Sequence, residues 1–403
     1  MAEPLNPAFP RCESLDDLAV FGGTPAFATP VHVGRPNIGD QERVLKRVRD
    51  ALDRHWLTNG GVLVEEFEQR MAELAGVEHC VAVCNATIGI QLAAKVLGLT
   101  GEVIVPSYTF IGTAHALSWI GLEPVFCEID PNTHTLDAHA VERAITPRTS
   151  AILGVHLWGR PCDIEGLDDV ARRHDLTLFY DAAHALGCSR GETPVGSFGQ
   201  CEVFSYHATK VASAAEGGAI TTNDAELARR LRLARNFGFA GYDTVVELGT
   251  NAKMSELSAA LGVSTLEQLG DFVARNRQNH EAYERHFAGI PGVRLNSRRD
   301  PGQHNFHYVV FETDPDIVNR DDLITMLHAE NVLARRYFYP GCHRLAPYVG
   351  SAESLPVTER IAAAVMVMPT GGSVTEDDIV EIARRVRVAA TNGADLGARL
   401  RNK

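Results

Sequence analysis

Apolar residues recur at helical spacing in several segments of the first half of the chain. Residues 41–55, for example, carry Val44, Val48 and Leu52 on one helical face. Short apolar or β-branched runs typical of strands lie at residues 80–84, 103–105, 124–129, 150–157, 176–180 and 202–205. Most are separated by amphipathic stretches, at residues 87–97, 138–145 and 164–174. This alternation predicts an α/β fold with a mainly parallel central sheet and helices on both of its faces.

The pattern changes in the second half of the chain. Helical spacing extends over a long stretch and is followed by turn-rich sequence, a short strand-like run and two further helical segments, at residues 255–287, 291–302, 308–311, 320–330 and 376–389. We therefore predict an N-terminal arm (residues 1–35), a large domain (residues 36–275) and a smaller C-terminal α+β domain (residues 276–403). A chain of 403 residues exceeds the size at which one hydrophobic core usually stops growing.

Composition narrows the class of protein. The net charge of −13 argues against sequence-independent binding of nucleic acid, which needs a basic surface. The first residues lack a signal-peptide core, and the apolar run at 361–368 is too short to span a bilayer, so no membrane association is expected. The eight cysteines show no C-x-x-C pair and no zinc-ligand spacing. We expect a cytoplasmic protein with reduced thiols and no metal site.

Polar residues follow several predicted strands at their carboxyl ends, where open α/β sheets bind ligands. The segments are Cys-Asn-Ala-Thr at 84–87, Pro-Ser-Tyr-Thr-Phe at 106–110, Asp-Ala-Ala-His at 181–184, Ser-Tyr-His-Ala-Thr-Lys at 205–210 and Glu-Gly-Gly at 216–218. One polar strand end is routine. Several together, with these side chains, predict a binding site at this edge of the sheet.

The cluster matches what pyridoxal 5′-phosphate (PLP) requires of a protein. Lys210 follows a buried strand, where lost hydration lowers the pKa of an amine, and is predicted to bond the cofactor covalently and to catalyse the reaction. Asp181 is predicted to pair with the protonated pyridine nitrogen. The only other serious candidate for the covalent lysine is Lys253, which lacks the strand-end position.

The phosphate and the ring face of PLP have candidate partners as well. The Thr87 hydroxyl, the helix N-terminal amides that follow it, such as that of Ile88, and Ser205 are predicted to bind phosphate. Phe110 is predicted to stack on the ring. Each residue alone has an ordinary explanation, Thr87 as a helix cap and Phe110 as a core residue. The prediction depends on their occurrence together.

These segments resemble the sugar aminotransferases of the DegT/DnrJ/EryC1/StrS family, over nearly the whole chain. The resembling segments are residues 106–110, 181–184, 204–210, 216–218 and 249–256. The resemblance implies the aspartate aminotransferase-like PLP fold type I. It also implies that His184 lies near the 3-hydroxyl of the cofactor. Asn251 is implied to reach the phosphate of a neighbouring subunit, which makes the protein a homodimer with its active site at the subunit interface.

Two departures from the family pattern occur, Ala86 in place of a glycine and Lys253 in place of an arginine. Lys253 puts in doubt any bidentate contact that the arginine makes. Lys210 itself bears on the reaction, because related sugar dehydratases have histidine at this position. With lysine present, the resemblance implies transamination, with L-glutamate as the amino donor and 2-oxoglutarate as the released product.

The substrate is predicted from two further segments. Residues 56–60 and 155–161 resemble the corresponding segments of enzymes that convert dTDP-4-keto-6-deoxy-D-glucose to dTDP-4-amino-4,6-dideoxy-D-glucose. Amination at C3, a UDP- or GDP-linked keto-sugar and a cyclitol ketone fit the same catalytic residues. Candidate substrate contacts are Thr58, Asn59, Tyr337, Tyr339 and His343; a packed aromatic turn explains the last three equally well.

Two other classes of protein share parts of the pattern. A nucleotide-dependent oxidoreductase has the same alternating sheet, but residues 84–89 lack the expected G-x-G-x-x-G. A PLP-binding regulator would carry an additional DNA-binding segment or lack the lysine that bonds the cofactor. Neither feature is apparent in the sequence. The aminotransferase is the favoured hypothesis.

Overall fold

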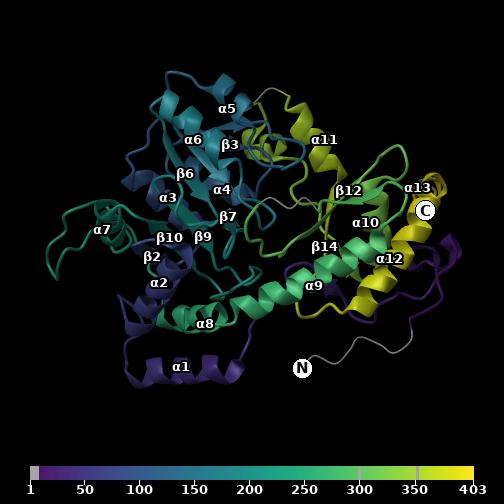
Figure 1. Ribbon diagram of the computed structural model, residues 1–403, viewed down its shortest axis with the longest axis horizontal. Helices are drawn as coiled ribbons and strands as arrows, with labels where there is room; N and C mark the ends of the chain where they lie inside the picture. The colour runs from purple at the N-terminus through teal and green to yellow at the C-terminus, as the bar shows by residue number, and fades with distance from the viewer. Residues whose placement is uncertain (1–8, 298–300, 351–353) are drawn as a thin grey trace.

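The computed structural model describes residues 9–297, 301–350 and 354–403 (Figure 1). Within these residues the main sheet has seven strands in the order β2-β10-β9-β6-β5-β3-β4. Their bounds are β2 (His79–Val83), β3 (Glu102–Pro106), β4 (Glu123–Cys127), β5 (Thr149–Val155), β6 (Thr177–Asp181), β9 (Glu202–Ser205) and β10 (Gly218–Thr222). Pairing is parallel except at β10, which is antiparallel to both β2 and β9. The predicted mainly parallel sheet is confirmed, and β10 is the strand that sequence patterning missed.

Helices cover both faces of this sheet, because successive strand residues point to opposite sides. Val81 and Val83 pack toward one face, and Cys80 and Ala82 toward the other. The first face is covered by α3 (Ala86–Val96), α4 (Ile111–Trp119) and α7 (Ala225–Ala234). The second face is covered by α2 (Val62–Ala75), α5 (Ala138–Ala144), α6 (Ile164–Arg173) and α8 (Glu256–Leu266). On the outer side of α8 lies α1 (Gln41–Asp53).

A second hydrophobic core surrounds a smaller sheet near the C-terminus. Its strands, in the order β11-β12-β14, are β11 (Val293–Leu295), β12 (Val309–Thr313) and β14 (Val365–Met368). The helices in this part are α9 (Leu269–Phe287), α10 (Arg320–Ala329), α11 (Pro356–Ala364), α12 (Glu376–Thr391) and α13 (Gly393–Arg401). Helix α9 runs from the large sheet to this core, where it packs beside α12 (Figure 1).

The N-terminal segment is packed against this second core from Cys12 onward. Leu18 and Phe27 are buried in it, and β1 (Val31–His32) pairs in parallel with β13 (Val332–Leu333). The buried Glu330 carboxylate accepts hydrogen bonds from the amides of Ala19 and Ala26 at 2.7 and 2.8 Å. Residues 1–8 of the predicted arm lie outside the described residues, and the predicted boundary at 275/276 falls inside α9. The division into domains stays a prediction.

The long helical stretch predicted over residues 255–287 consists of two helices, α8 and α9. The two helices meet at Glu267 and Gln268, where a side chain takes one of the last carbonyls of α8. The Gln268 side-chain amide donates to the Ser264 carbonyl at 3.1 Å, and the Thr265 hydroxyl lies closer to the Ser213 carbonyl, at 2.8 Å, than to the Gly262 carbonyl of its own helix, at 3.1 Å. Such local hydrogen bonds compete with continuation of a helix. None of the helices in the described ranges is both long and apolar enough to cross a membrane.

Gly218 opens β10 where that strand passes the start of α3. A Cβ atom there would lie 2.7–2.9 Å from backbone atoms of Asn85 and Ala86. Gly218→Ala is therefore expected to lower the free energy of unfolding by about 1–3 kcal/mol, because the backbone has to shift. Chemical denaturation measures this change. Gly270→Ala, which meets nothing within 4 Å on α9, is the control and is expected to leave stability unchanged or higher. Equal stability of the two variants would contradict the close approach.

Candidate active site

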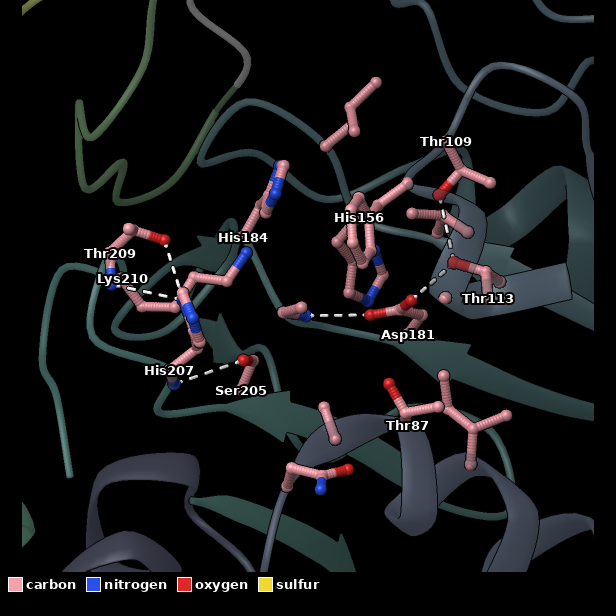
Figure 2. A pocket seen from close by; sticks show the side chains of 18 of the residues that line it. Thr87, Thr109, Thr113, His156, Asp181, His184, Ser205, His207, Thr209 and Lys210 are labelled. Carbon is pink, nitrogen blue, oxygen red and sulfur yellow. Dashed lines mark hydrogen bonds between the residues drawn. The ribbon is translucent and has the colours of Figure 1, made fainter. Parts of the chain in front are cut away.

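A cavity of about 500 Å³ lies at the carboxyl ends of β5, β6 and β9, beside the first turns of α3 and α4 (Figure 2). The predicted site residues that line it are Thr87, Ile88, Phe110, Asp181, His184, Ser205, Lys210 and Tyr337. In Figure 2, Lys210 lies on one side of the pocket, with Asp181 and Thr113 on the other. The polar strand ends of the sequence are therefore brought together.

Lys210 reaches the cavity through a tight turn that follows β9. Its backbone amide donates to the His207 carbonyl at 2.9 Å, and His307 Nε2 donates to the carbonyl of the preceding Thr209 at 2.7 Å. The amine lies 3.5 Å from the Tyr308 hydroxyl. Burial lowers the pKa of Lys210 to about 8, against the opposing attraction of Asp181. At pH 7 about a tenth of the amine is therefore uncharged and nucleophilic, far more than of a lysine with the ordinary pKa.

Asp181 ends β6 with its carboxylate buried. One carboxylate oxygen, Oδ2, accepts a hydrogen bond from the Thr113 hydroxyl at 2.8 Å, and the other, Oδ1, from the Ala183 amide at 3.0 Å. Lys210 is the one lysine among the residues that line the cavity in the described part of the chain. A carboxylate and a partly neutral amine thus face one cavity.

The predicted phosphate donors lie at the start of α3 and the end of β9. The Thr87 side chain is half-buried at the cavity wall. The amide of Ile88 already donates to the Asn85 side chain at 2.9 Å, because Asn85 caps the helix. The Ser205 hydroxyl accepts from the His207 amide at 3.3 Å and keeps its own proton to donate. Thr87 and Ser205 are therefore better placed than Ile88 to bind an anion.

Aromatic rings form much of the remaining wall. His184 stacks on Tyr308 with ring centroids 4.2 Å apart, and its pKa lies well below the usual value because of burial and nearby Lys210. Tyr337 and Phe338 also line the cavity. Phe110 stands beside it with 60% of its surface exposed, which leaves its ring face free to stack on a ligand.

Five predicted site residues do not line this cavity within the described chain. Thr58, Asn59 and Asn251 are exposed elsewhere, and Asn59 lines a small separate pocket with Lys253. Tyr339 is half exposed beside the Arg320 guanidinium. His343 is buried with both ring nitrogens occupied, by Ser107 at 2.6 Å and Glu359 at 3.0 Å. His343 is therefore a packed residue of the turn, the alternative given above, and the geometry does not support a direct contact between His343 and the substrate.

The sequence profile of the DegT/DnrJ/EryC1/StrS aminotransferases matches residues 39–387. The chain belongs to the DegT/DnrJ/EryC1/StrS aminotransferase family. The predicted fold type I and the predicted enzyme class, a PLP-dependent sugar aminotransferase, are confirmed, as is PLP as the cofactor.

Three similar proteins illustrate the range of this family. The structure of DesI in the presence of its TDP-sugar product has 52% sequence identity and a TM-score of 0.93, and the match covers 96% of this chain and 100% of that one. The dTDP-4-amino-4,6-dideoxy-D-glucose transaminase of Shigella dysenteriae is 35% identical over 89% of this chain and 98% of its own. The GDP-perosamine synthase of Caulobacter vibrioides is 35% identical over 87% and 95%.

The residues of the cavity fit PLP. The Nδ1 atom of His184 is buried without a hydrogen-bond partner among the described atoms, and buried polar atoms are rarely left so. The cavity also offers a carboxylate, an amine of lowered pKa and hydroxyl groups at a helix N-terminus, which are the groups that this cofactor needs. No cluster of His, Cys, Asp and Glu suited to a metal ion occurs in the described ranges.

The lowered pKa of Lys210 has a consequence for the stability of the cofactor-free protein. Its folded-state value of about 8 lies below the unfolded value, so the charged amine destabilises the fold below pH 8. Lys210→Met removes that penalty and is expected to be the more stable protein at pH 7. Its advantage over wild type is expected to shrink by about 1.4 kcal/mol per pH unit between pH 8 and 10.

Urea denaturation at several pH values measures this difference. The control is Lys95→Met, on an exposed face of α3, which is expected to show no such pH dependence relative to wild type. A Lys210→Met advantage that stays constant from pH 8 to 10 would contradict a buried, partly neutral amine.

Sequence reasoning did not single out Thr113, Tyr308 or His307, which the structure places in the cavity wall or beside Lys210. Thr113 had a detectable signal, since its hydroxyl lies in the first turn of a helix directly after the polar strand end at residues 106–110. His307 and Tyr308 lie directly before β12, far along the chain. Only the packing of the smaller sheet against the larger one brings them to Lys210.

Proposed function

We propose that the protein transfers an amino group from L-glutamate to dTDP-4-keto-6-deoxy-D-glucose, forming dTDP-4-amino-4,6-dideoxy-D-glucose and 2-oxoglutarate. The observation that carries the proposal is the single cavity shared by Lys210 and Asp181, in a chain 52% identical to DesI, whose structure was determined with its TDP-sugar product. The reaction belongs to the biosynthesis of deoxyamino sugars.

In this proposal Asp181 pairs with the ring nitrogen of PLP, and the hydroxyls of Thr87 and Ser205 bind its phosphate. Phe110 covers one face of the ring, and His184 lies near its 3-hydroxyl. When bound, PLP supplies an electron sink for a carbon atom next to nitrogen. All of these side chains line the cavity, which supports the assignment.

Lys210 acts both as the covalent anchor and as the acid/base catalyst. Its pKa of about 8 lies near physiological pH, the range in which proton transfer by a side chain is most efficient. With the cofactor bound, the amine would carry a proton between the substrate carbon and the C4′ position of PLP, in opposite directions in the two half-reactions. The Lys210 side chain moves on a fixed backbone, because hydrogen bonds from His307 and within the turn at residues 207–210 hold the main chain there.

A second substrate is favoured by one specific observation. The GDP-perosamine synthase of Caulobacter vibrioides matches this chain with 35% identity, so a GDP-linked 4-keto sugar is the alternative. The aromatic residues Tyr308, Tyr337 and Phe338 suit either sugar, because they pack against the apolar face of a deoxyhexose. The nucleotide therefore distinguishes the two candidates.

Assay of a substrate panel tests the proposal. The PLP-loaded protein is incubated with L-glutamate and, in turn, dTDP-4-keto-6-deoxy-D-glucose, a GDP-linked 4-keto-6-deoxy sugar and a dTDP-linked 3-keto sugar. Mass spectrometry of the amino-sugar products is expected to give kcat/KM at least about 100-fold higher for the first. A preference for either of the others would replace the substrate, and no product from any of them would refute the proposed reaction.

The proposal includes a homodimer in the cytoplasm. Thr58, Asn59 and Asn251 are exposed outside the cavity of their own chain, which suits contact with the site of a second copy. The loop after α7 also exposes Tyr242 and Leu248. All eight cysteines are free thiols, which suits a reducing compartment. Sedimentation of the purified protein tests the dimer directly.

A further inference from the structure

The first turn of α4 contacts the carboxylate of Asp181. Thr113, 1% exposed, donates its hydroxyl proton to Asp181 Oδ2 at 2.8 Å, and lies 3.0 Å from the hydroxyl of Thr109, which is 3% exposed (Figure 2). Residues 113 and 181 lie on different elements, α4 and the end of β6. The contact is therefore a tertiary one and has no role in forming either element.

The direction of these hydrogen bonds is fixed by chemistry. An ionised carboxylate only accepts, so the Thr113 proton is committed to Asp181. The Thr113 oxygen then accepts from Thr109, since its single proton is already used. Both hydroxyl groups point their protons toward the carboxylate. A chain of this kind is polarised, and each bond strengthens the next.

The arrangement fixes the plane of the carboxylate. Oδ2 is held by Thr113 from α4, and Oδ1 by the Ala183 amide at 3.0 Å from the loop after β6. Two donors from separate elements leave the group no free rotation about its terminal bond. The remaining lone pairs of the two oxygens are then available to the cavity that Asp181 lines.

Capping of its own helix does not account for the Thr113 hydroxyl. The N-cap of α4 is Phe110, which makes no side-chain cap. The hydroxyl bonds instead to a residue 68 positions away in sequence. The buried Thr113 hydroxyl therefore acts on the Asp181 carboxylate in the cavity wall.

We propose that Thr113, supported by Thr109, is a positioning residue that orients the Asp181 carboxylate toward the ring nitrogen of PLP. This inference rests on the role proposed above for Asp181. Thr113 itself does not touch the cofactor's nitrogen. It acts by keeping one carboxylate oxygen aimed at that position through each half of the reaction.

The test compares Thr113→Val, which removes the hydroxyl at nearly constant volume, with Thr113→Ser, which keeps it. Thr113→Val is expected to slow both half-reactions by about 10- to 100-fold, the usual worth of a hydrogen bond to a charged group. Thr113→Ser is expected to stay within about 3-fold of wild type on the same basis. Thr313→Val, a buried threonine of the small sheet that donates to the Ala364 carbonyl, is the control for loss of a buried hydroxyl.

Two further readouts separate positioning from a merely structural role. Thr113→Val is expected to weaken PLP binding to the cofactor-free protein and to shift the pH at which the visible band of the bound cofactor changes. Thr313→Val is expected to move neither. Circular dichroism and thermal unfolding of each variant report folding, and recovery in Thr113→Ser shows that the hydroxyl itself matters.

A double-mutant cycle with Asp181→Asn decides the mechanism. If Thr113 acts through Asp181, then adding Thr113→Val to Asp181→Asn is expected to cause less than about 3-fold further loss. The full loss in both backgrounds, or no loss in Thr113→Val alone while Asp181→Asn is impaired, would overturn the inference. Full activity of Asp181→Asn alone would instead refute the proposed role of Asp181.

Discussion

Lys210→Ala is expected to lower the rate of transamination by at least about 10⁴-fold, the upper range for loss of a catalytic acid/base, because the same side chain also supplies the covalent anchor. The amine lies in the cavity with its pKa lowered to about 8. Formation of 2-oxoglutarate and of the amino sugar measures the two halves of the reaction separately. We expect both halves to be lost together.

Cofactor binding is expected to survive this change in part, since the phosphate and ring contacts remain. The matched control is Lys95→Ala, an exposed lysine on α3 that does not line the cavity. It is expected to keep wild-type rates. Measurable turnover at the wild-type level in Lys210→Ala would remove this residue from catalysis and direct attention to Lys253.

Asp181→Asn is expected to lower both half-reactions by about 10²- to 10³-fold, as loss of a preorganised electrostatic contact typically does. Asparagine has nearly the same shape as aspartate but no charge, so it cannot stabilise a protonated ring nitrogen. The change also removes the acceptor for a charge-assisted hydrogen bond from Thr113. Stopped-flow absorbance with L-glutamate measures the first half-reaction.

An exposed aspartate provides the comparison. Asp169 lies on α6, where it pairs with Arg172 and Arg173 outside the cavity. Asp169→Asn is expected to leave the rates unchanged. Near-normal rates in Asp181→Asn would exclude this carboxylate as the partner of the ring nitrogen, whatever its position in the cavity.

Much of the large sheet could be predicted from the sequence because its strands are buried on both faces. Continuous apolar runs such as residues 150–157 predict such strands. Polar residues directly after these runs indicate the carboxyl ends of the strands, where ligands bind. This logic singled out Lys210, Asp181, Thr87 and Ser205, all of which line the cavity. The short strand β10 was missed because Gly218–Thr222 contains one large apolar residue, Ile220, and so has little apolar periodicity.

Other features could not be predicted because they depend on tertiary contacts. The amide of Ile88 was expected to be free, but the Asn85 side chain caps it, a choice among donors that sequence does not decide. Tyr308 reaches Lys210 only through packing of the two sheets. Helix α13 follows the last helical segment that was predicted, at residues 376–389, and was missed although its Leu396 is completely buried.

The substrate contacts predicted in the aromatic turn at residues 335–343 have different outcomes. Tyr337 lines the cavity, whereas His343 is fully hydrogen-bonded by Ser107 and Glu359. The family resemblance indicated the aromatic turn as a whole, but it did not indicate which of its side chains face inward. The roles of Asn59 and Asn251 require a second copy of the chain and stay predictions.

The central claim is that Lys210 is the residue that bonds the cofactor. It is tested most directly by borohydride reduction of the PLP-loaded protein, which makes the bond between cofactor and lysine permanent, followed by digestion and mass spectrometry of the peptides. The added mass of the reduced cofactor is expected on Lys210. Its appearance on Lys253, or on no lysine of a protein that carries PLP, would show that Lys210 does not bond the cofactor.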